Sequence, residues 1–206
     1  MRVGVLVDGD AESQALRNLT RRITIPGVQV TDPIYAPMQP TATPERIVAD
    51  AKERLETLMA VRRVDKILVL IDHEHRTECP GDRAEALCKY FHAAGYPLVS
   101  VVVKNRKLEN WLVSDTSVFR RARGRYKLTT SFVNSVEPNK ADNVVDAEAL
   151  LNSIVIGCAY HKRKDAAQIT ALQNPATVAL HSRSFRRLLR LLGQSSYQTQ
   201  SRRPAT

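Results

Sequence analysis

The stretch that decides the fold is Lys66-Ile67-Leu68-Val69-Leu70-Ile71-Asp72-His73-Glu74, in which an apolar run ends abruptly in two acidic residues. The apolar run between Lys66 and Asp72 is too short for an independent helix, so it predicts a strand that is buried on both faces. Ligands of open α/β sheets bind at the carboxyl ends of the strands. Asp72 and Glu74 are therefore expected to face a ligand-binding crevice.

The N-terminus repeats this arrangement. Val3-Gly4-Val5-Leu6-Val7 is a second apolar run; it leads into Asp8-Gly9-Asp10, and Glu12 follows. Parallel strands end at the same edge of a sheet, so the acids of both runs are expected to form one acidic site. Taken alone, Asp8 or Asp10 could simply cap the following helix, and Glu74 could be a solvated loop residue. The prediction rests on acids that occur in pairs at two strand ends.

The segments around these two strands alternate between helix and strand patterns. Helices are expected at 11–23, from Pro44 onward after the Thr43 cap, and after Pro80; strands are expected at 97–103 and, as an edge strand, within 28–35. This alternation predicts an α/β fold with a mostly parallel central sheet and helices on both faces, as in Rossmann-like proteins.

The second half of the chain predicts a helical extension. A short helix is expected at 107–115, a last strand at 128–136, a helix at 142–159 and a final helix at 183–192, capped by Ser182. The predicted organisation is an α/β core at 1–115, a basic segment and helical extension packed on it at 116–193, and a disordered tail at 194–206.

The composition is strongly basic. The 206 residues carry a formal net charge of +10, which favours a polyanionic partner such as nucleic acid. Aromatic residues are too few for a base-stacking platform, so contacts are expected to be with phosphate. The candidate residues form one basic segment: Arg120, Arg121, Arg123, Arg125 and Lys127. Basic surfaces of this kind are also commonly just solvated.

The three cysteines are Cys79, Cys88 and Cys158, an odd number without the spacing of a disulfide framework. No N-terminal stretch resembles a signal peptide, and no apolar run approaches the roughly 20 residues of a transmembrane helix. The sequence therefore predicts a soluble, cytoplasmic protein with no membrane partner.

Five acids from separate segments are predicted to share the crevice. Clustered carboxylates repel one another unless a cation lies between them, and oxygen-only ligands suit Mg²⁺ or Mn²⁺. Two such ions are expected to activate a water and to stabilise the leaving oxygen of a phosphodiester. The predicted metal ligands are Asp8, Glu12, Asp72, Glu74 and Glu109.

Three motifs together resemble the Toprim fold: the Asp8-Gly-x-x-Glu12 opening, Asp72-His73-Glu74, and Leu108-Glu109-Asn110-Trp111-Leu112. The likeness is greatest to stand-alone Toprim-like proteins related to the OLD (overcoming lysogenization defect) nucleases, often encoded beside ATPases in bacterial anti-phage loci. It covers 1–115, and a looser match continues through 157–162 and 184–189.

This resemblance implies a metal-dependent nuclease that cleaves DNA or RNA, with DNA favoured. It implies catalytic roles for the five acids and for Lys162, which would steady the phosphate; Lys164 is the rival for that role. It also implies an ATPase partner and a part in anti-phage defence, and it leaves a homodimer open. Asp8 stands where the family usually has Glu, and Glu74 where it has Asp. Each change keeps an oxygen ligand but alters its reach.

Other functions remain open on the sequence alone. The fold could persist without the chemistry, as a catalytically inactive binding or sensing module. Val7-Asp8-Gly9-Asp10 also resembles the opening of PIN/NYN-type ribonucleases, and Asp8, Asp10, Asp72 and Lys104 loosely resemble a phosphoacceptor receiver domain. The basic charge and the carboxyl-terminal extension argue against a receiver.

Overall fold

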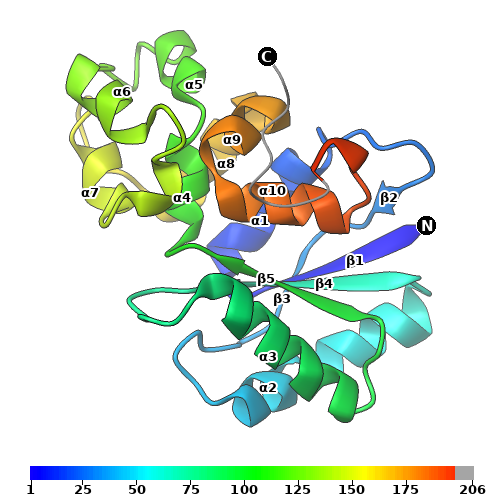
Figure 1. The fold of residues 1–206 in the computed structure, drawn as a ribbon. Coiled ribbons are helices and arrows are strands. Elements are labelled where there is room, and N and C mark those ends of the chain that lie inside the picture. Colours follow the sequence, from blue (N-terminus) through cyan, green and yellow to red (C-terminus); the bar gives the residue numbers. More distant parts are fainter. Residues whose placement is uncertain (198–206) are drawn as a thin grey trace.

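A parallel β-sheet with helices on both faces forms the centre of the molecule in the computed structural model, which describes residues 1–197 (Figure 1). Its strands are β1 (Arg2–Val7), β2 (Gln29–Val30), β3 (Ile34–Tyr35), β4 (Lys66–Asp72) and β5 (Val99–Lys104). Their order is β2-β1-β4-β5, and β3 pairs with β1 beyond β2. The predicted α/β fold is confirmed, and the predicted edge strand is present as the two short strands β2 and β3.

The pairing register aligns the carboxyl ends of the three long strands. Val7 of β1 lies opposite Leu70 of β4, and Asp72 at the end of β4 lies opposite Lys104 at the end of β5. Asp8 follows β1 directly. The chain therefore brings one charged residue from each strand end to the same edge of the sheet.

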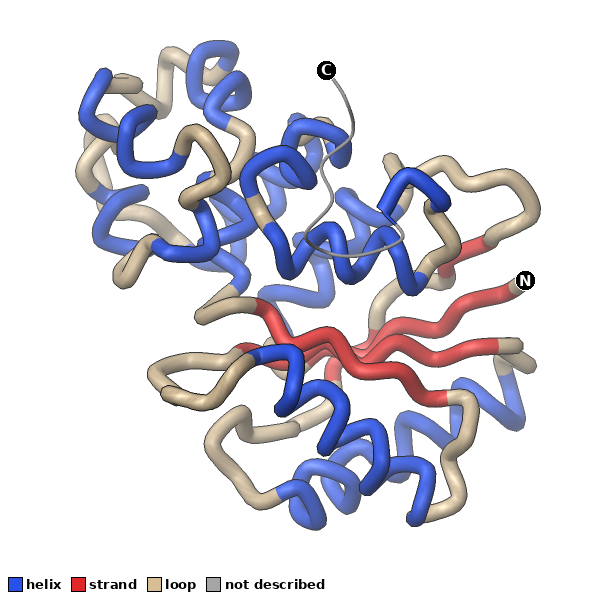
Figure 2. Tube along the Cα trace, in the orientation of Figure 1, coloured by secondary structure: helices blue, strands red, loops and turns tan. Residues whose placement is uncertain are grey.

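The two faces of the sheet bury different residues of β4. Leu68 and Leu70 belong to the core cluster that includes α1 (Asp10–Thr20) and the carboxyl-terminal helices. Ile67, Val69 and Ile71 belong to the cluster under α2 (Pro44–Glu56) and α3 (Pro80–Ala93). Figure 2 shows these helices as separate layers on either side of the strands. This alternation is the period of two that side chains follow along a strand.

Gly4 of β1 allows a close approach between the sheet and the turn after α2. A Cβ atom at Gly4 would lie 2.9 Å from Cδ2 of Leu58, a fully buried side chain in the π-helical turn Thr57–Val61. Gly4 itself pairs with Ile67 in the middle of the sheet. The backbone there cannot move away without disturbing the β1-β4 pairing.

We expect Gly4→Ala to lower the free energy of unfolding by about 1–3 kcal/mol, the usual range for overpacking a well-packed core. Urea denaturation followed by circular dichroism measures this. Gly124→Ala is the matched control, because a Cβ at Gly124 meets no atom within 4 Å. Equal stabilities of the two variants would contradict the close packing.

Seven helices follow the sheet in the described part of the chain. They are α4 (Leu108–Val113), α5 (Thr116–Arg121), α6 (Thr130–Val136), α7 (Ala147–Asn152), α8 (Lys162–Leu172), α9 (Pro175–His181) and α10 (Arg183–Leu191). The predicted short helix is present as α4. The final helix is confirmed with its cap, because the Ser182 side chain accepts a hydrogen bond from the Phe185 amide.

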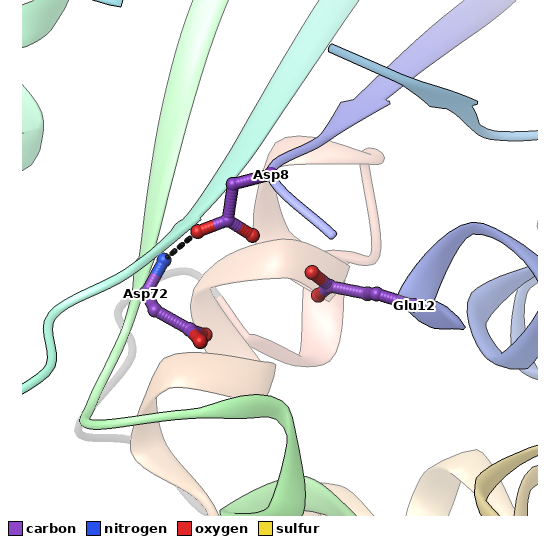
Figure 3. A group of neighbouring side chains, drawn as sticks. All are labelled: Asp8, Glu12 and Asp72. Carbon is purple, nitrogen blue, oxygen red and sulfur yellow. Dashed lines mark hydrogen bonds between the residues drawn. The ribbon is translucent and has the colours of Figure 1, made fainter. Parts of the chain in front are cut away.

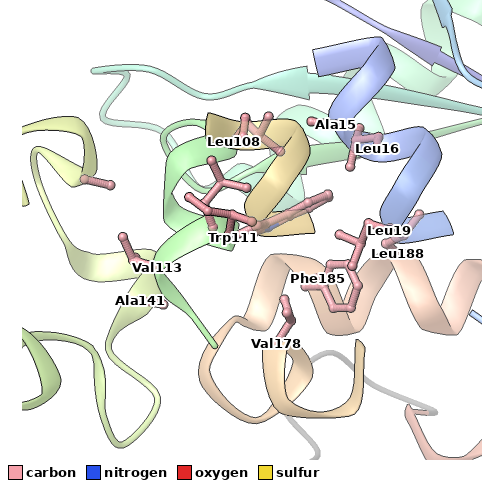
Figure 4. Packing of buried hydrophobic residues seen from close by; sticks show 14 of the residues in the cluster. Ala15, Leu16, Leu19, Leu108, Trp111, Val113, Ala141, Val178, Phe185 and Leu188 are labelled. Carbon is pink, nitrogen blue, oxygen red and sulfur yellow. The ribbon is translucent and has the colours of Figure 1, made fainter. Parts of the chain in front are cut away.

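Trp111 of α4 holds this helical layer together. Its ring packs edge-on against Phe185 of α10 with 5.1 Å between centroids, and its Nε1 donates to Oγ of Ser184 at 2.7 Å. Figure 4 shows Trp111 and Phe185 packed with residues of α1 and α9 in one apolar cluster. The helices of 116–193 contribute to the same cluster as the sheet residues Val3 and Val5.

Two sequence predictions in this region are wrong. Residues 128–136 form helix α6 in place of the expected strand, because the Thr129 side chain caps the Phe132 amide and Phe132 and Val136, four apart, are both buried on one helix face. The expected long helix at 142–159 is reduced to a 3-10 turn (Ala141–Asn143) and α7. Asp146 caps α7 and so sets its start, and Val145, which precedes it, is 68% exposed.

The tail that was predicted to be disordered begins with an ordered turn. Ser195–Tyr197 form a 3-10 turn with a buried Tyr197. The rest of the predicted tail, 198–206, lies outside the described residues. None of the helices in 1–197 combines the length and the apolar character that crossing a bilayer requires.

Candidate metal and phosphate site

Three carboxylates converge at the carboxyl edge of the sheet. Asp8 follows β1, Glu12 lies in the first turn of α1 and Asp72 ends β4. One oxygen from each lies within 4.8 Å of the others, and the three side chains point toward one another in Figure 3. Oδ2 of Asp8 accepts a hydrogen bond of 2.7 Å from the Asp72 amide, which ties the ends of β1 and β4 together.

All six residues that the sequence proposed as catalytic line one cavity of about 220 Å³ at this edge. The cavity is lined by Asp8, Glu12, Asp72, Glu74, Glu109 and Lys162, together with Gly9, Ala11, Pro40, Lys107 and Leu108. Segments far apart in the sequence thus meet around one small space.

Lys104 also belongs to the site, although it was not among the predicted metal ligands or catalytic residues. Its side chain is fully buried, and Nζ lies 2.9 Å from Oδ1 of Asp8 and 2.9 Å from Oδ1 of Asp72. Nζ also donates to Oε1 of Glu12. The signals in the sequence were the loose resemblance of Asp8, Asp10, Asp72 and Lys104 to a receiver domain, and a lysine at the end of the apolar run 99–103, which is equally typical of a solvated strand end.

The carboxylates have shifted pKa values because they are buried around a single ammonium group. Burial raises the pKa of Asp8, but the charge of Lys104 and hydrogen bonds from Glu12 and the Asp72 amide bring it below its ordinary value. Burial raises the pKa of Glu12 well above its ordinary value. The charge of Lys104 opposes this rise, whereas repulsion from Asp8 and Asp72 adds to it. The pKa of Glu12 is therefore raised and that of Asp8 is lowered, although both carboxylates contact the same ammonium group.

Burial and the attraction between opposite charges also have opposing effects on the pKa values of Asp72 and Lys104. Burial raises the pKa of Asp72 to about 7, although Lys104 attracts its charged form, and the charge of Asp8 adds to the rise. Burial lowers the pKa of Lys104, but the three carboxylates more than offset this and hold it well above its ordinary value. Lys104 stays charged, and Asp72 changes its charge near neutral pH.

Glu74 is held by an unusual backbone turn. Glu74 and Arg106 have φ angles of 59° and 76°, a left-handed conformation that residues other than glycine rarely adopt. The Glu74 amide donates to the Arg106 carbonyl at 2.9 Å, which joins the ends of β4 and β5 beyond the regular pairing. Strained positions of this kind often occur at functional sites. Nζ of Lys107 lies 3.8 Å from the Glu74 carboxylate.

Glu109 and Lys162 enter the cavity from the helical layer. Glu109 is buried in α4, and Oη of Tyr160 donates to its Oε1 at 3.4 Å. Lys162 opens α8, and its Nζ lies 3.0 Å from Glu148. The rival Lys164 is not among the residues that line this cavity.

The donor set fits a hard divalent cation. The three converging ligand atoms are all carboxylate oxygens, which suit Mg²⁺ or Mn²⁺. Oδ1 of Asp72 lies 2.9 Å from Nζ of Lys104, so a cation that binds here shares these carboxylates with the ammonium group. Asp10 lies apart from this set, because its side chain is 59% exposed and pairs with Arg163.

Residues 7–193 match the profile of a family described as a domain of unknown function, DUF4276. The chain belongs to the DUF4276 family. The matched range contains every residue of the site from Asp8 to Lys162. No curated protein and no solved structure gives a match.

The basic segment of this DUF4276 chain divides into two groups. Arg120, Arg123 and Lys127 line an open groove of about 580 Å³ between α5 and α6. Arg125 is not available for the predicted contact with phosphate. Its five N–H donors all reach the Asp165 carboxylate or the carbonyls of 156, 158 and 159. Arg121 likewise donates to the Leu172 carbonyl at the end of α8.

Proposed function

We propose that this protein is a divalent-metal-dependent nuclease that cleaves phosphodiester bonds, with DNA favoured over RNA. The observation that supports this most is the single cavity lined by five carboxylates and Lys162 at the carboxyl edge of the sheet. Acids in such number, three of them converging on one point, are costly to bury without a cation. Phosphodiester cleavage is the chemistry in which bound Mg²⁺ or Mn²⁺ and a nearby cationic side chain act together.

Each residue has a role in this proposal. Asp72 and Glu109, with Glu12 and Glu74 beside them, hold the metal, which when bound supplies positive charge for the phosphate and lowers the pKa of water. Lys162 binds a phosphate oxygen from the opposite wall.

The groove between α5 and α6 is the proposed path of the nucleic-acid backbone. Arg120, Arg123 and Lys127 line it, and no ion pair holds any of them within the described residues. Phosphate contacts of this kind give affinity without sequence preference. Arg121 and Arg125 are left out of this surface, because their guanidinium groups are engaged inside the fold.

We also propose the compartment and the partners of this activity. Cys79, Cys88 and Cys158 are all free, which supports a reducing compartment such as the cytoplasm. The ATPase partner and the part in anti-phage defence rest on the resemblance to OLD-related proteins alone. A homodimer remains open.

One observation favours a second candidate function, a binding module without catalysis. Lys104 already supplies a positive charge to Asp8, Glu12 and Asp72, as a bound cation would. A site neutralised in this way can persist without a metal. Calorimetric titration with Mn²⁺ separates the two candidates, because the binding module takes up no ion at millimolar concentration.

Metal affinity is expected to depend on pH through Asp72. The carboxyl group must lose its proton to bind a cation, and its pKa is about 7. The Kd for Mn²⁺ should therefore rise about tenfold for each pH unit below that value and level off above it. Calorimetry at about pH 6, 7 and 8 measures this, with proton release checked in buffers of different ionisation heat. A pH-independent Kd would contradict the role of Asp72.

The test of the proposed function is cleavage of defined substrates. Purified protein is incubated with supercoiled plasmid, single-stranded DNA or single-stranded RNA, with Mg²⁺, with Mn²⁺ or with a chelator. The proposal predicts nicking or degradation that needs the metal, faster on DNA than on RNA. No metal-dependent cleavage of any substrate would overturn it.

A further inference from the structure

We propose that the site takes one divalent ion per chain, and that the Lys104 ammonium group permanently occupies the place of a second. This inference rests on the proposed function and deepens it. It departs from the pair of ions that the cluster of acids predicts from sequence.

Lys104 cannot leave the cluster of acids without unfolding the end of the sheet. Its backbone pairs with Asp72 in the β4-β5 ladder, and its carbonyl accepts a hydrogen bond of 3.0 Å from the His73 amide. The side chain has no exposed surface, and Nζ has three carboxylate partners: one directly after β1, one in α1 and one at the end of β4. An entering metal ion must therefore lie beside Nζ, because it cannot replace it.

Asp8 is engaged by the fold on both oxygens. Oδ1 accepts from Nζ of Lys104 at 2.9 Å, and Oδ2 accepts from the Asp72 amide at 2.7 Å. Asp8 is thus a positioning residue, which holds Lys104 and the end of β4. Glu12 likewise gives one oxygen to Lys104.

The oxygens left for a metal are those that Lys104 does not contact. Lys104 contacts Oδ1 of Asp72, which leaves Oδ2 of that carboxylate, and Glu109 accepts only the long contact from Tyr160 on Oε1 within the described residues. Both residues line the cavity, and Lys162 lines it too. This space offers ligands for one ion, with the phosphate-binding lysine at hand.

The formal charges agree with a single ion. Five carboxylates contact or line the cavity, and the ammonium groups of Lys104, Lys107 and Lys162 lie with them. With all five carboxyl groups ionised, these groups together carry two negative charges, which one divalent cation cancels. A second divalent ion would add two positive charges in a buried setting next to Lys104, where like charges repel strongly.

The test is the number of Mn²⁺ ions bound by the full chain, from calorimetric stoichiometry and from electron paramagnetic resonance, which detects exchange-coupled Mn²⁺ pairs. Wild-type protein is expected to bind one ion per chain with no coupled-pair spectrum. Lys104→Met is expected to bind two ions and to give that spectrum.

The possible outcomes distinguish a failure of this inference from a failure of the proposed function. Two ions in the wild type would overturn this inference and leave the proposed nuclease standing, whereas no ion would overturn the proposed function and the inference with it. A folded Lys104→Met variant that still binds one ion would also overturn the inference. If Lys104→Met fails to fold, the wild-type stoichiometry alone still decides.

Discussion

Replacing Asp72 with asparagine is expected to lower the rate of metal-dependent DNA cleavage by at least about 1000-fold, or about 4 kcal/mol of transition-state stabilisation. Asp72 ends the central strand, lines the cavity and is one of the three carboxylates that converge there. Asparagine keeps the shape of the side chain but removes the charge that attracts the cation. The measurement is the initial rate of plasmid nicking with Mn²⁺.

The matched control for this variant is Asp10→Asn. Asp10 is also an acid near the end of β1, but its side chain is exposed and pairs with Arg163 outside the cavity. Its nicking rate should stay close to that of the wild type. Unchanged nicking by Asp72→Asn would show that the activity, if present, lies elsewhere on the protein.

Replacing Lys104 with methionine is expected to lower the free energy of unfolding by about 3–5 kcal/mol, the cost of leaving buried charges without their partner. Methionine fills most of the volume, so the loss reports charge more than packing. Three carboxylates would then face one another with no ammonium group between them. Urea denaturation of the metal-free protein measures the effect.

A control variant and the addition of Mn²⁺ test this prediction further. Lys89→Met, which removes an exposed lysine paired with Glu85 on α3, should change stability by no more than about 0.5 kcal/mol. Mn²⁺ should restore part of the stability of Lys104→Met, because a bound cation takes over the missing charge. A Lys104→Met variant as stable as the wild type without metal would contradict the proposed role of Lys104.

The fold could be predicted from the sequence because its decisive elements are local patterns. The apolar runs of β1 and β4 each end in acids, and parallel strands bring their carboxyl ends to one edge. Asp8, Asp72 and Glu74 were therefore predictable from their positions at strand ends, whereas Glu12 and Glu109 lie in helices. Their placement around one cavity follows from the order β2-β1-β4-β5.

The rest depended on contacts between distant parts of the chain. The role of Lys104 follows from its pairing with Asp72, which no local pattern reveals. The sequence alone predicts that Arg125 is a free basic residue. In the fold, its guanidinium group donates hydrogen bonds to the carbonyls of 156 and 159. At 128–136 the β-branched residues favoured a strand, whereas the Thr129 cap and the burial of Phe132 and Val136 made a helix.

The most direct test of the account is diffraction from crystals grown with Mn²⁺, recorded near the manganese absorption edge. We predict one anomalous peak per chain in the cavity, within about 2.5 Å of carboxylate oxygens of Asp72 and Glu109, with Nζ of Lys104 still paired to Asp8. A cavity without any peak, in crystals that contain Mn²⁺ at millimolar concentration, would contradict the claim that this edge of the sheet is a metal site.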